Sequence, residues 1–271
     1  VADGQLNEEF FSNMSHELKT PLNLIFSALQ VLDLYSKNNL EPDKDDKIRG
    51  YTDTINQNSY RLLKLVNNLV DLTRIESNSY DFKLENHNII EIIGLIANST
   101  RGHIESKGRI FRFNSDIYYK LVPCDPFNIE RIILNLLSNA VKFTDIGDEI
   151  SINICEEKDE IKISVKDTGI GIKASEQEKI FDRFRQAEDG KMTPRNNIGS
   201  GIGLSLVQSL VSLHNGRLEV ESTYGQGSEF NIYLPVGSPS EDDGDELGTI
   251  GYQQIGIVER LNIEFSDIYK L

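Results

Sequence analysis

The amino-acid sequence predicts an α+β protein in which an N-terminal helical hairpin is followed by an α/β sandwich, a mixed sheet with helices on one face. Up to about Glu76, apolar residues recur at steps of three, four and seven positions, which is a helical period. From about Tyr80 the pattern changes to short strand-like runs that alternate with helical ones. Hairpin-like pairs among these runs indicate antiparallel pairing, which favours helices gathered on one face of the sheet.

The first part of the chain predicts two long helices joined by a polar turn at 38–46. The apolar positions of the first helix are Met14, Leu18, Leu22, Ile25, Leu29 and Leu32. The second helix ends near Glu76 and carries Ile48, Ile55, Leu62 and Leu69 seven apart, with Tyr51, Leu65 and Leu72 beside them. Because one hairpin alone would leave much of this apolar face in water, we expect two copies to form a four-helix bundle.

The second part of the chain predicts six strands and three helices. The strands are expected at 109–114, 119–123, 149–156, 160–167, 217–222 and 228–234, and the helices at 89–106, 126–143 and 201–214. Residues 172–198 show no clear period and indicate a long loop.

The C-terminal part begins with an acidic linker at 237–248. The alternation of Leu261, Ile263 and Phe265 then predicts a strand that packs on the domain, with a disordered tail as the alternative that stays open. We therefore expect three parts: a dimerisation hairpin at 1–78, an α/β domain at 79–236, and a linker with a strand-like tail of unknown role at 237–271.

Composition narrows the functional classes. The net charge of -15 argues against nucleic acid as a partner, because phosphate backbones select basic surfaces. The two cysteines, Cys124 and Cys155, have no metal-ligand or redox spacing, and we expect both to be reduced. No apolar run is long enough to cross a bilayer, and the first residue is Val. We expect a cytoplasmic catalytic portion of a longer protein, with any membrane contact made only through segments absent from this chain.

A possible nucleophile lies on the first helix, in the segment 11–21 (FSNMSHELKTP). His16 and Thr20 are four residues apart and therefore share one helix face. A neutral imidazole is a competent nucleophile near neutral pH, and Glu17 can orient the ring and accept its proton. Taken alone, this His–Glu pair could equally be a solvated helix surface.

A possible nucleotide site begins on the helix that follows Asp125 and Pro126. Asn135, Asn139 and Lys142 fall within about 60° of one another on this helix, opposite an apolar face. An amide oxygen can bind magnesium, and a lysine can meet phosphate charge. Alone, this polar ridge would indicate an exposed helix face.

Two glycine-containing segments follow. Asp167, Gly169 and Gly171 come at the end of a predicted strand, where the carboxylate could accept a hydrogen bond from an adenine amino group and the glycines allow a close approach of the backbone. The segment 199–204 (GSGIGL) leads into a helix, whose N-terminal N–H groups suit phosphates. Either segment alone could be an ordinary turn or loop.

Taken together, these motifs resemble the kinase core of the sensor histidine kinases of two-component systems over about residues 10–235. The motifs occur in one order: the His16 segment, Asn135-x-x-x-Asn139, Asp167-x-Gly169-x-Gly171, Phe181-x-x-Phe184 and Gly199-x-Gly201-x-Gly203. In that family a dimerising helical hairpin precedes a gyrase-like ATP-binding domain.

The resemblance implies a role for each motif. His16 would be the phosphoacceptor, Glu17 its base and Thr20 a determinant of phosphatase activity toward the response regulator. The nucleotide site for ATP and Mg²⁺ would comprise Asn135, Asn139 as the metal ligand, Lys142 near the phosphates, Asp167 at adenine, Gly169, Gly171, Phe184, Arg185, Gly199, Gly201, Gly203 and Leu204. Residues 172–200 would form a lid, in which Gln186 stands where many relatives carry a second arginine.

The implied activity is ATP-dependent phosphorylation of His16 in a homodimer, followed by transfer to an aspartate in the receiver domain of a response regulator. Two alternatives remain open from sequence. One is an ATP-driven conformational machine with the same nucleotide fold, and the other is a degenerate kinase that serves as a dimeric scaffold.

Overall fold

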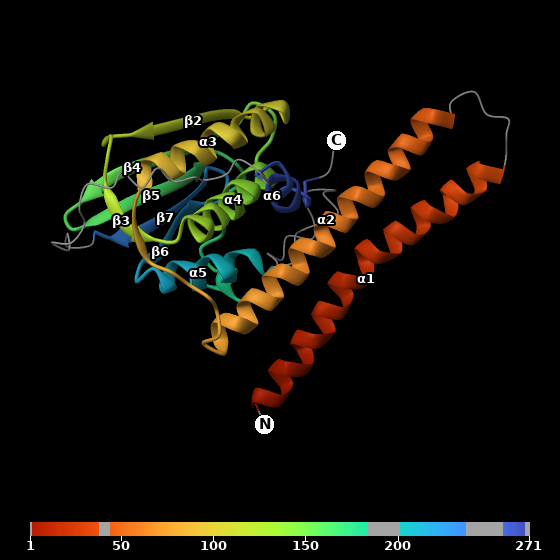
Figure 1. Cartoon of the computed structure of the whole chain (residues 1–271), viewed down its shortest axis with the longest axis horizontal. Helices are drawn as coiled ribbons and strands as arrows, with labels where there is room; N and C mark the ends of the chain where they lie inside the picture. Colours follow the sequence, from red (N-terminus) through yellow and green to blue (C-terminus); the bar gives the residue numbers. More distant parts are fainter. Residues whose placement is uncertain (1, 38–43, 184–200, 237–256, 269–271) are drawn as a thin grey trace.

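The structure is a computed structural model that describes residues 2–37, 44–183, 201–236 and 257–268. Helix α1 (Ala2–Lys37) and helix α2 (Lys44–Glu76) lie side by side as the predicted hairpin (Figure 1). Helix α2 has Asp45 and Asp46 in its first turn and Arg74 in its last, which complements the helix dipole. Most of the predicted turn, 38–43, lies outside the described residues.

Pro21 lies inside α1 and does not end it. A proline in a helix interior has no N–H to donate to the carbonyl four residues earlier. One residue before it, the Thr20 hydroxyl donates to the backbone carbonyl of His16 over 3.2 Å. The helix is therefore continuous from His16 through Pro21, and the two predicted functional side chains stay one turn apart.

The sheet is mixed, as predicted, and has five strands in the order β2-β4-β5-β7-β6. These strands are β2 (Ile110–Ser115), β4 (Glu149–Glu157), β5 (Glu160–Asp167), β6 (Arg217–Thr223) and β7 (Gly227–Pro235). Strand β2 is parallel to β4, and the other neighbours are antiparallel. The sixth predicted strand, β3 (Leu121–Cys124), pairs with the unpredicted β1 (Glu85–Asn88) in a separate two-stranded sheet.

Three helices cover one face of the five-stranded sheet, and α2 runs along the layer that they form (Figure 1). They are α3 (Ile89–Ser106), α4 (Pro126–Phe143) and α5 (Gly203–Leu213), all of which the sequence predicts. The core between sheet and helices is rich in isoleucine, with Ile132, Ile152 and Ile163 fully buried. At the start of α4, the Asp125 carboxylate accepts from the backbone N–H groups of Phe127 and Asn128, which is the predicted cap.

The prediction of a C-terminal strand is wrong. Residues 257–264 form helix α6 (Ile257–Glu264), which contacts α2 and α4. Leu261 and Phe265 are four apart and share one helix face, so a short apolar alternation also fits a helical period. Phe265 is buried in the main core and Leu261 packs against it. Packing against two helices therefore decides the conformation of this segment.

Within the described ranges, no helix combines the length and the apolar character that a membrane crossing requires.

Candidate functional site

The His16 side chain is exposed on α1. Its neighbour Glu17 points toward α2, where the guanidinium of Arg61 lies 3.6 Å from the Glu17 carboxylate. Both of these side chains are largely removed from solvent. The candidate nucleophile thus faces outward, while the candidate base is held by a cation of the second helix.

Two cations on α2 belong to this region and were missed from sequence. Arg61 is 6% exposed and Lys64 is 8% exposed. Together with the buried Asn58 and Asn68 they recur at helical spacing along the face of α2 that meets the ATP-binding domain. A polar stripe at this period could have been read from the sequence, but it looks like a solvated face unless the neighbouring domain is known.

The polar ridge on α4 is less exposed than the sequence suggests. Asn135 is 2% exposed and its amide donates to the backbone carbonyl of Arg131 over 3.1 Å. Asn139 and Lys142 are half-buried. The opposite apolar face packs on the sheet as expected, but the ridge is covered in turn by α5, α6 and side chains of α2. Because α4 lies between two layers, its polar residues line an internal boundary and not an outer surface.

The pKa of Lys142 is lowered to about 8, mainly by burial and in addition by the nearby cations Lys64 and Arg61. The carboxylates of Asp267 and Glu17 act in the opposite direction. Glu17 of the phosphoacceptor segment and Lys142 of the nucleotide segment are thus electrostatic neighbours. An anion bound at Lys142 would restore its ordinary affinity for a proton.

Asp167 ends β5 and is 6% exposed. Burial raises its pKa to about 6, although N–H groups of Gly169 and Ser228 stabilise the ionised form. The Gly169 N–H donates to its Oδ1 over 2.9 Å. The adenine contact that the sequence assigns to this carboxylate stays a prediction.

Glycines are required where the turn after β5 meets its neighbours. A Cβ on Gly169 would lie 2.2 Å from the carbonyl oxygen of Phe143 at the end of α4. Gly171 has a φ of 66°, and its Cβ would lie 2.2 Å from the carbonyl oxygen of Thr223. Gly227, which the sequence reasoning missed, has a φ of 100° and would place a Cβ 2.0 Å from the Asp167 carbonyl oxygen. Because they have no Cβ, these glycines allow the turn to pack directly against α4 and the β6–β7 connection.

The glycine-rich segment before α5 also packs against α4. A Cβ on Gly203 would lie 2.8 Å from Oδ1 of Asn135, so α5 begins directly against α4. Gly201 adopts a φ of 67°, and Leu204 packs against the core. The N-cap residue Ile202 has no side-chain acceptor, which leaves N–H groups of the first turn to a ligand or to water. Phe184, Arg185, Gln186 and Gly199 lie outside the described residues.

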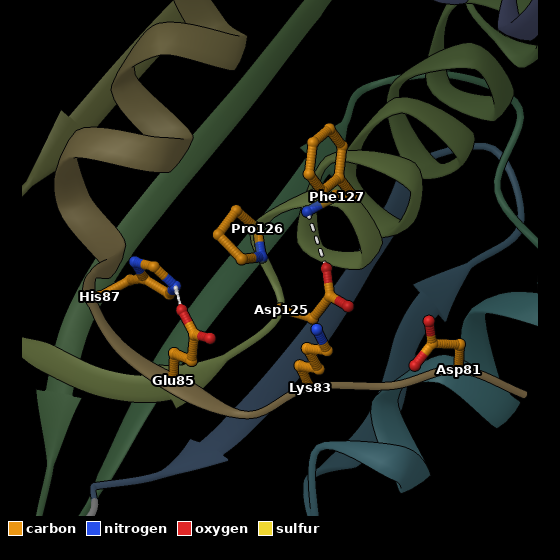
Figure 2. A pocket seen from close by; sticks show the side chains of 7 residues that line it. All are labelled: Asp81, Lys83, Glu85, His87, Asp125, Pro126 and Phe127. Atoms are coloured by element: carbon orange, nitrogen blue, oxygen red, sulfur yellow. Dashed lines mark hydrogen bonds and ion pairs between the residues drawn. The ribbon is translucent and has the colours of Figure 1, made fainter. Parts of the chain in front are cut away.

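A hollow of about 290 Å³ lies at the other end of α4. Figure 2 shows its lining, with Asp125 bound to the Phe127 N–H at the helix start. This end is roughly 24 Å from Lys142, at 1.5 Å of helix rise per residue. The hollow therefore lies away from the residues predicted to bind the nucleotide, and we do not assign it to ATP.

Two family models match the chain. The model of the phosphoacceptor domain of histidine kinases matches residues 6–78, and the model of the histidine kinase-, DNA gyrase B- and HSP90-like ATPases matches residues 124–238. The chain belongs to the sensor histidine kinases of two-component systems. The second model supports ATP as the nucleotide of this kinase.

Curated sensor kinases are similar to this one. The sensor histidine kinase WalK of Bacillus subtilis is 34% identical over 246 residues, which are 89% of this chain and 39% of WalK. The autoinducer 2 sensor kinase/phosphatase LuxQ of Vibrio cholerae is 34% identical over 236 residues, which are 86% of this chain and 26% of LuxQ. This chain thus spans less than half the length of these relatives.

The fold agrees with that of a solved histidine kinase. The structure of ThkA in complex with the response regulator TrrA has a TM-score of 0.62 to this kinase, with 21% identity, and the match covers 84% of this chain and 61% of the other. This likeness confirms the predicted arrangement of a helical hairpin followed by an α/β ATPase domain.

We predict that Gly171→Ala destabilises the ATP-binding domain more than Gly225→Ala. Both glycines have a positive φ, so either alanine pays about 1 kcal/mol for a left-handed backbone. Only Gly171 adds a clash, since no atom lies within 4 Å of a Cβ at Gly225, and we expect roughly 2 kcal/mol more. Urea unfolding of both variants measures the difference. Equal losses of stability would show that the turn can move away from Thr223.

Proposed function

We propose that this kinase phosphorylates its own His16 with ATP and passes the phosphoryl group to an aspartate of a response regulator. The observation that carries the proposal is that Arg61 of α2 bridges two carboxylates, Glu17 next to His16 at 3.6 Å and Asp267 of the segment packed on α4 at 3.5 Å. Phosphoryl transfer depends mainly on positioning and on charge neutralisation. The charged side chains at the junction of the hairpin with the rest of the protein, next to Glu17, support the charge neutralisation that the proposed transfer requires.

Each residue has a role in the proposed transfer. One imidazole nitrogen of His16 attacks the γ-phosphorus, the bond from that phosphorus to the oxygen bridging the β-phosphate breaks, and ADP leaves. Glu17 accepts the proton from the other imidazole nitrogen. Lys142 neutralises phosphate charge, and the first turn of α5 offers its N–H groups. Asp167 accepts from the adenine amino group, and Asn135 supports the site by contact with Gly203.

Magnesium fits the donor set. The described residues hold no group of three or more His, Cys, Asp or Glu side chains that could bind a metal ion. Magnesium in nucleotide sites usually keeps water and phosphate ligands and takes few from the protein. The half-buried Asn139 would contribute one amide oxygen, and the ion would neutralise phosphate charge.

The partners follow from exposed surfaces and from the relatives. The hairpin exposes large apolar side chains at Leu22, Leu24, Phe26, Leu29, Leu34, Leu63, Val66 and Val70. A second copy that completes a four-helix bundle would bury them. The ThkA–TrrA complex supports a response regulator as partner, and the name of LuxQ supports an added phosphatase activity.

We also propose that the hairpin ends at residue 78 and the ATP-binding domain at 236. Cys124 and Cys155 are free thiols, which fits a catalytic portion in the cytoplasm.

We predict that His16→Gln lowers incorporation of acid-labile label from γ-labelled ATP by roughly 100-fold or more, because the nucleophile is lost. Nucleotide affinity should stay near that of the wild type, since His16 lies on the hairpin. Filter assays and a fluorescent nucleotide measure the two quantities. Stable labelling of the variant would place the phosphoacceptor elsewhere, and an unlabelled wild type would favour an ATPase machine or a scaffold.

We predict that ATP binding weakens as the pH falls through about 6. The pKa of Asp167 is about 6, and only the ionised carboxylate accepts the adenine amino group freely. The dissociation constant should rise roughly tenfold between pH 7 and pH 5. Asp167→Asn serves as the control, because it removes this titration but keeps that of the nucleotide. The same pH dependence in both proteins would remove Asp167 from the adenine site.

We predict that Thr20→Ala slows dephosphorylation of the response regulator roughly tenfold and changes self-phosphorylation less than about twofold. The hydroxyl shares the exposed face of His16 and can accept a hydrogen bond from a water that attacks the acyl phosphate. Thr20→Ser keeps the hydroxyl and should retain both rates. Parallel loss of both activities in Thr20→Ala would mean that the residue only shapes α1 beside Pro21.

A further inference from the structure

The C-terminal segment, residues 257–268, lies between the hairpin and the ATP-binding domain. It comprises α6 and the turn that follows, and Figure 1 shows it between α4 and α2. Phe265 is 3% exposed, and its ring centroid lies 4.6 Å from that of His103 on α3. Arg260 forms an ion pair with the buried Glu130 of α4 over 2.8 Å. These contacts attach the segment to the ATP-binding domain.

The same segment is bound to α2 through its backbone carbonyls. The amide of Gln57 donates to the carbonyls of Ser266 and Ile268, over 3.1 and 3.3 Å. The Glu264 carbonyl accepts from Lys64 of α2 over 2.7 Å and from Ser138 of α4 over 2.8 Å. The last carbonyls of a helix need such partners. The end of α6 therefore joins a hairpin helix to the nucleotide-binding helix.

The Asp267 carboxylate lies in the group of cations next to the phosphoacceptor. One of its oxygens is 3.6 Å from the Lys64 ammonium, and the other is 3.5 Å from the Arg61 guanidinium. Lys142 is a further charge partner. Arg61 also reaches Glu17, so Asp267 lies between the phosphoacceptor segment and the lysine that we assign to the phosphates.

Asp267 neutralises the cations around it. Burial raises its pKa, but Lys64, Lys142 and Arg61 outweigh burial, and the pKa lies below the ordinary value for aspartate. The carboxylate is therefore ionised at neutral pH. A half-buried anion that faces three cations has the charge complementarity of a bound phosphoryl group.

We propose that the C-terminal segment is an intramolecular inhibitor, in which Asp267 occupies the place of phosphoryl oxygens among Arg61, Lys64 and Lys142 and holds α2 against α4. This inference rests on the proposed role of Lys142 in phosphate binding. The γ-phosphate and the Asp267 carboxylate compete for the same cations. The segment is also bound to both α2 and α4, so its contacts restrain any movement of the hairpin relative to the ATP-binding domain.

The contacts of the C-terminal segment allow it to dissociate from α2 and α4. An eight-residue helix is not stable by itself, so α6 forms only while it is docked. Several of its contacts are ion pairs and hydrogen bonds to backbone carbonyls, which water can replace. Phe265 is the one fully buried large apolar side chain among residues 259–268, and Leu261 and Ile268 are partly buried.

The test compares Asp267→Asn with Glu259→Gln in the full chain. Each variant removes one negative charge from the segment, but Glu259 is exposed on α6. At limiting γ-labelled ATP, Asp267→Asn should raise the initial rate of self-phosphorylation and the nucleotide affinity roughly fivefold or more, in the usual range of coupling between sites. Glu259→Gln should match the wild type. An unchanged or slower rate in Asp267→Asn would mean that the segment only stabilises the fold, and it would overturn the proposal.

Hydrogen exchange of the wild type gives a second readout that needs no substitution. A non-hydrolysable ATP analogue with Mg²⁺ should speed amide exchange in residues 257–268 roughly tenfold. Unchanged exchange at saturating analogue would overturn the inhibitor while leaving the kinase proposal in place. A wild type that binds no nucleotide and takes up no label would overturn both proposals together.

Discussion

The arrangement of the site depends on helix α4 being packed on both faces. Its apolar face lies on the sheet, and its polar face meets α5, α6 and side chains of α2. Buried polar groups need partners, so Asn135 donates to Arg131, and Ser138 donates to Glu264. The C-terminal part of α4 is thereby the place where the glycine-rich segment, the C-terminal segment and the hairpin converge. If the polar face of α4 were exposed to water, the helix would carry the same sequence motif, but these three segments would not meet at it.

Charge pairing holds the hairpin against the rest of the protein. Arg183 pairs with Glu76 at the end of α2, and two further junctions lie nearer to α4. At one, Arg131 of α4 forms an ion pair with Asp71 of α2 over 2.7 Å and donates to the Tyr80 hydroxyl. At the other, Lys64 and Arg61 meet Asp267. Removing one partner of a buried pair is costly, because the other charge is left in a poorly solvated position. Both junctions therefore favour the observed arrangement until another anion or cation replaces a partner.

The charge pairs between the hairpin and the domain bear on how the kinase is regulated, because their partners can be replaced. In the proposed function, the γ-phosphate has to reach His16, and a response regulator has to reach the same side chain afterwards. The described contacts of α2 with the domain are both polar, as between Arg131 and Asp71, and apolar, since Leu65 and Leu72 belong to the buried core. Polar contacts can exchange for phosphate and water at little net cost, whereas an extended apolar interface could not. The polar part of the junction between the hairpin and the ATP-binding domain is therefore compatible with more than one arrangement of the two.

The sequence alone determined the two helices of the hairpin, all three helices of the sandwich, the six predicted strands and the family, because periodicity, the Asp125 cap and the motif order are local properties of the chain. It did not determine whether the α4 ridge is exposed, since burial of Asn135 depends on helices more than 60 residues away. It also mistook α6 for a strand, because the spacing of Leu261 and Phe265 fits both a strand period and a helical period. Only the tertiary structure decided these points, together with the convergence of Arg61, Lys64 and Asp267, because contacts between segments so far apart leave no period in the sequence.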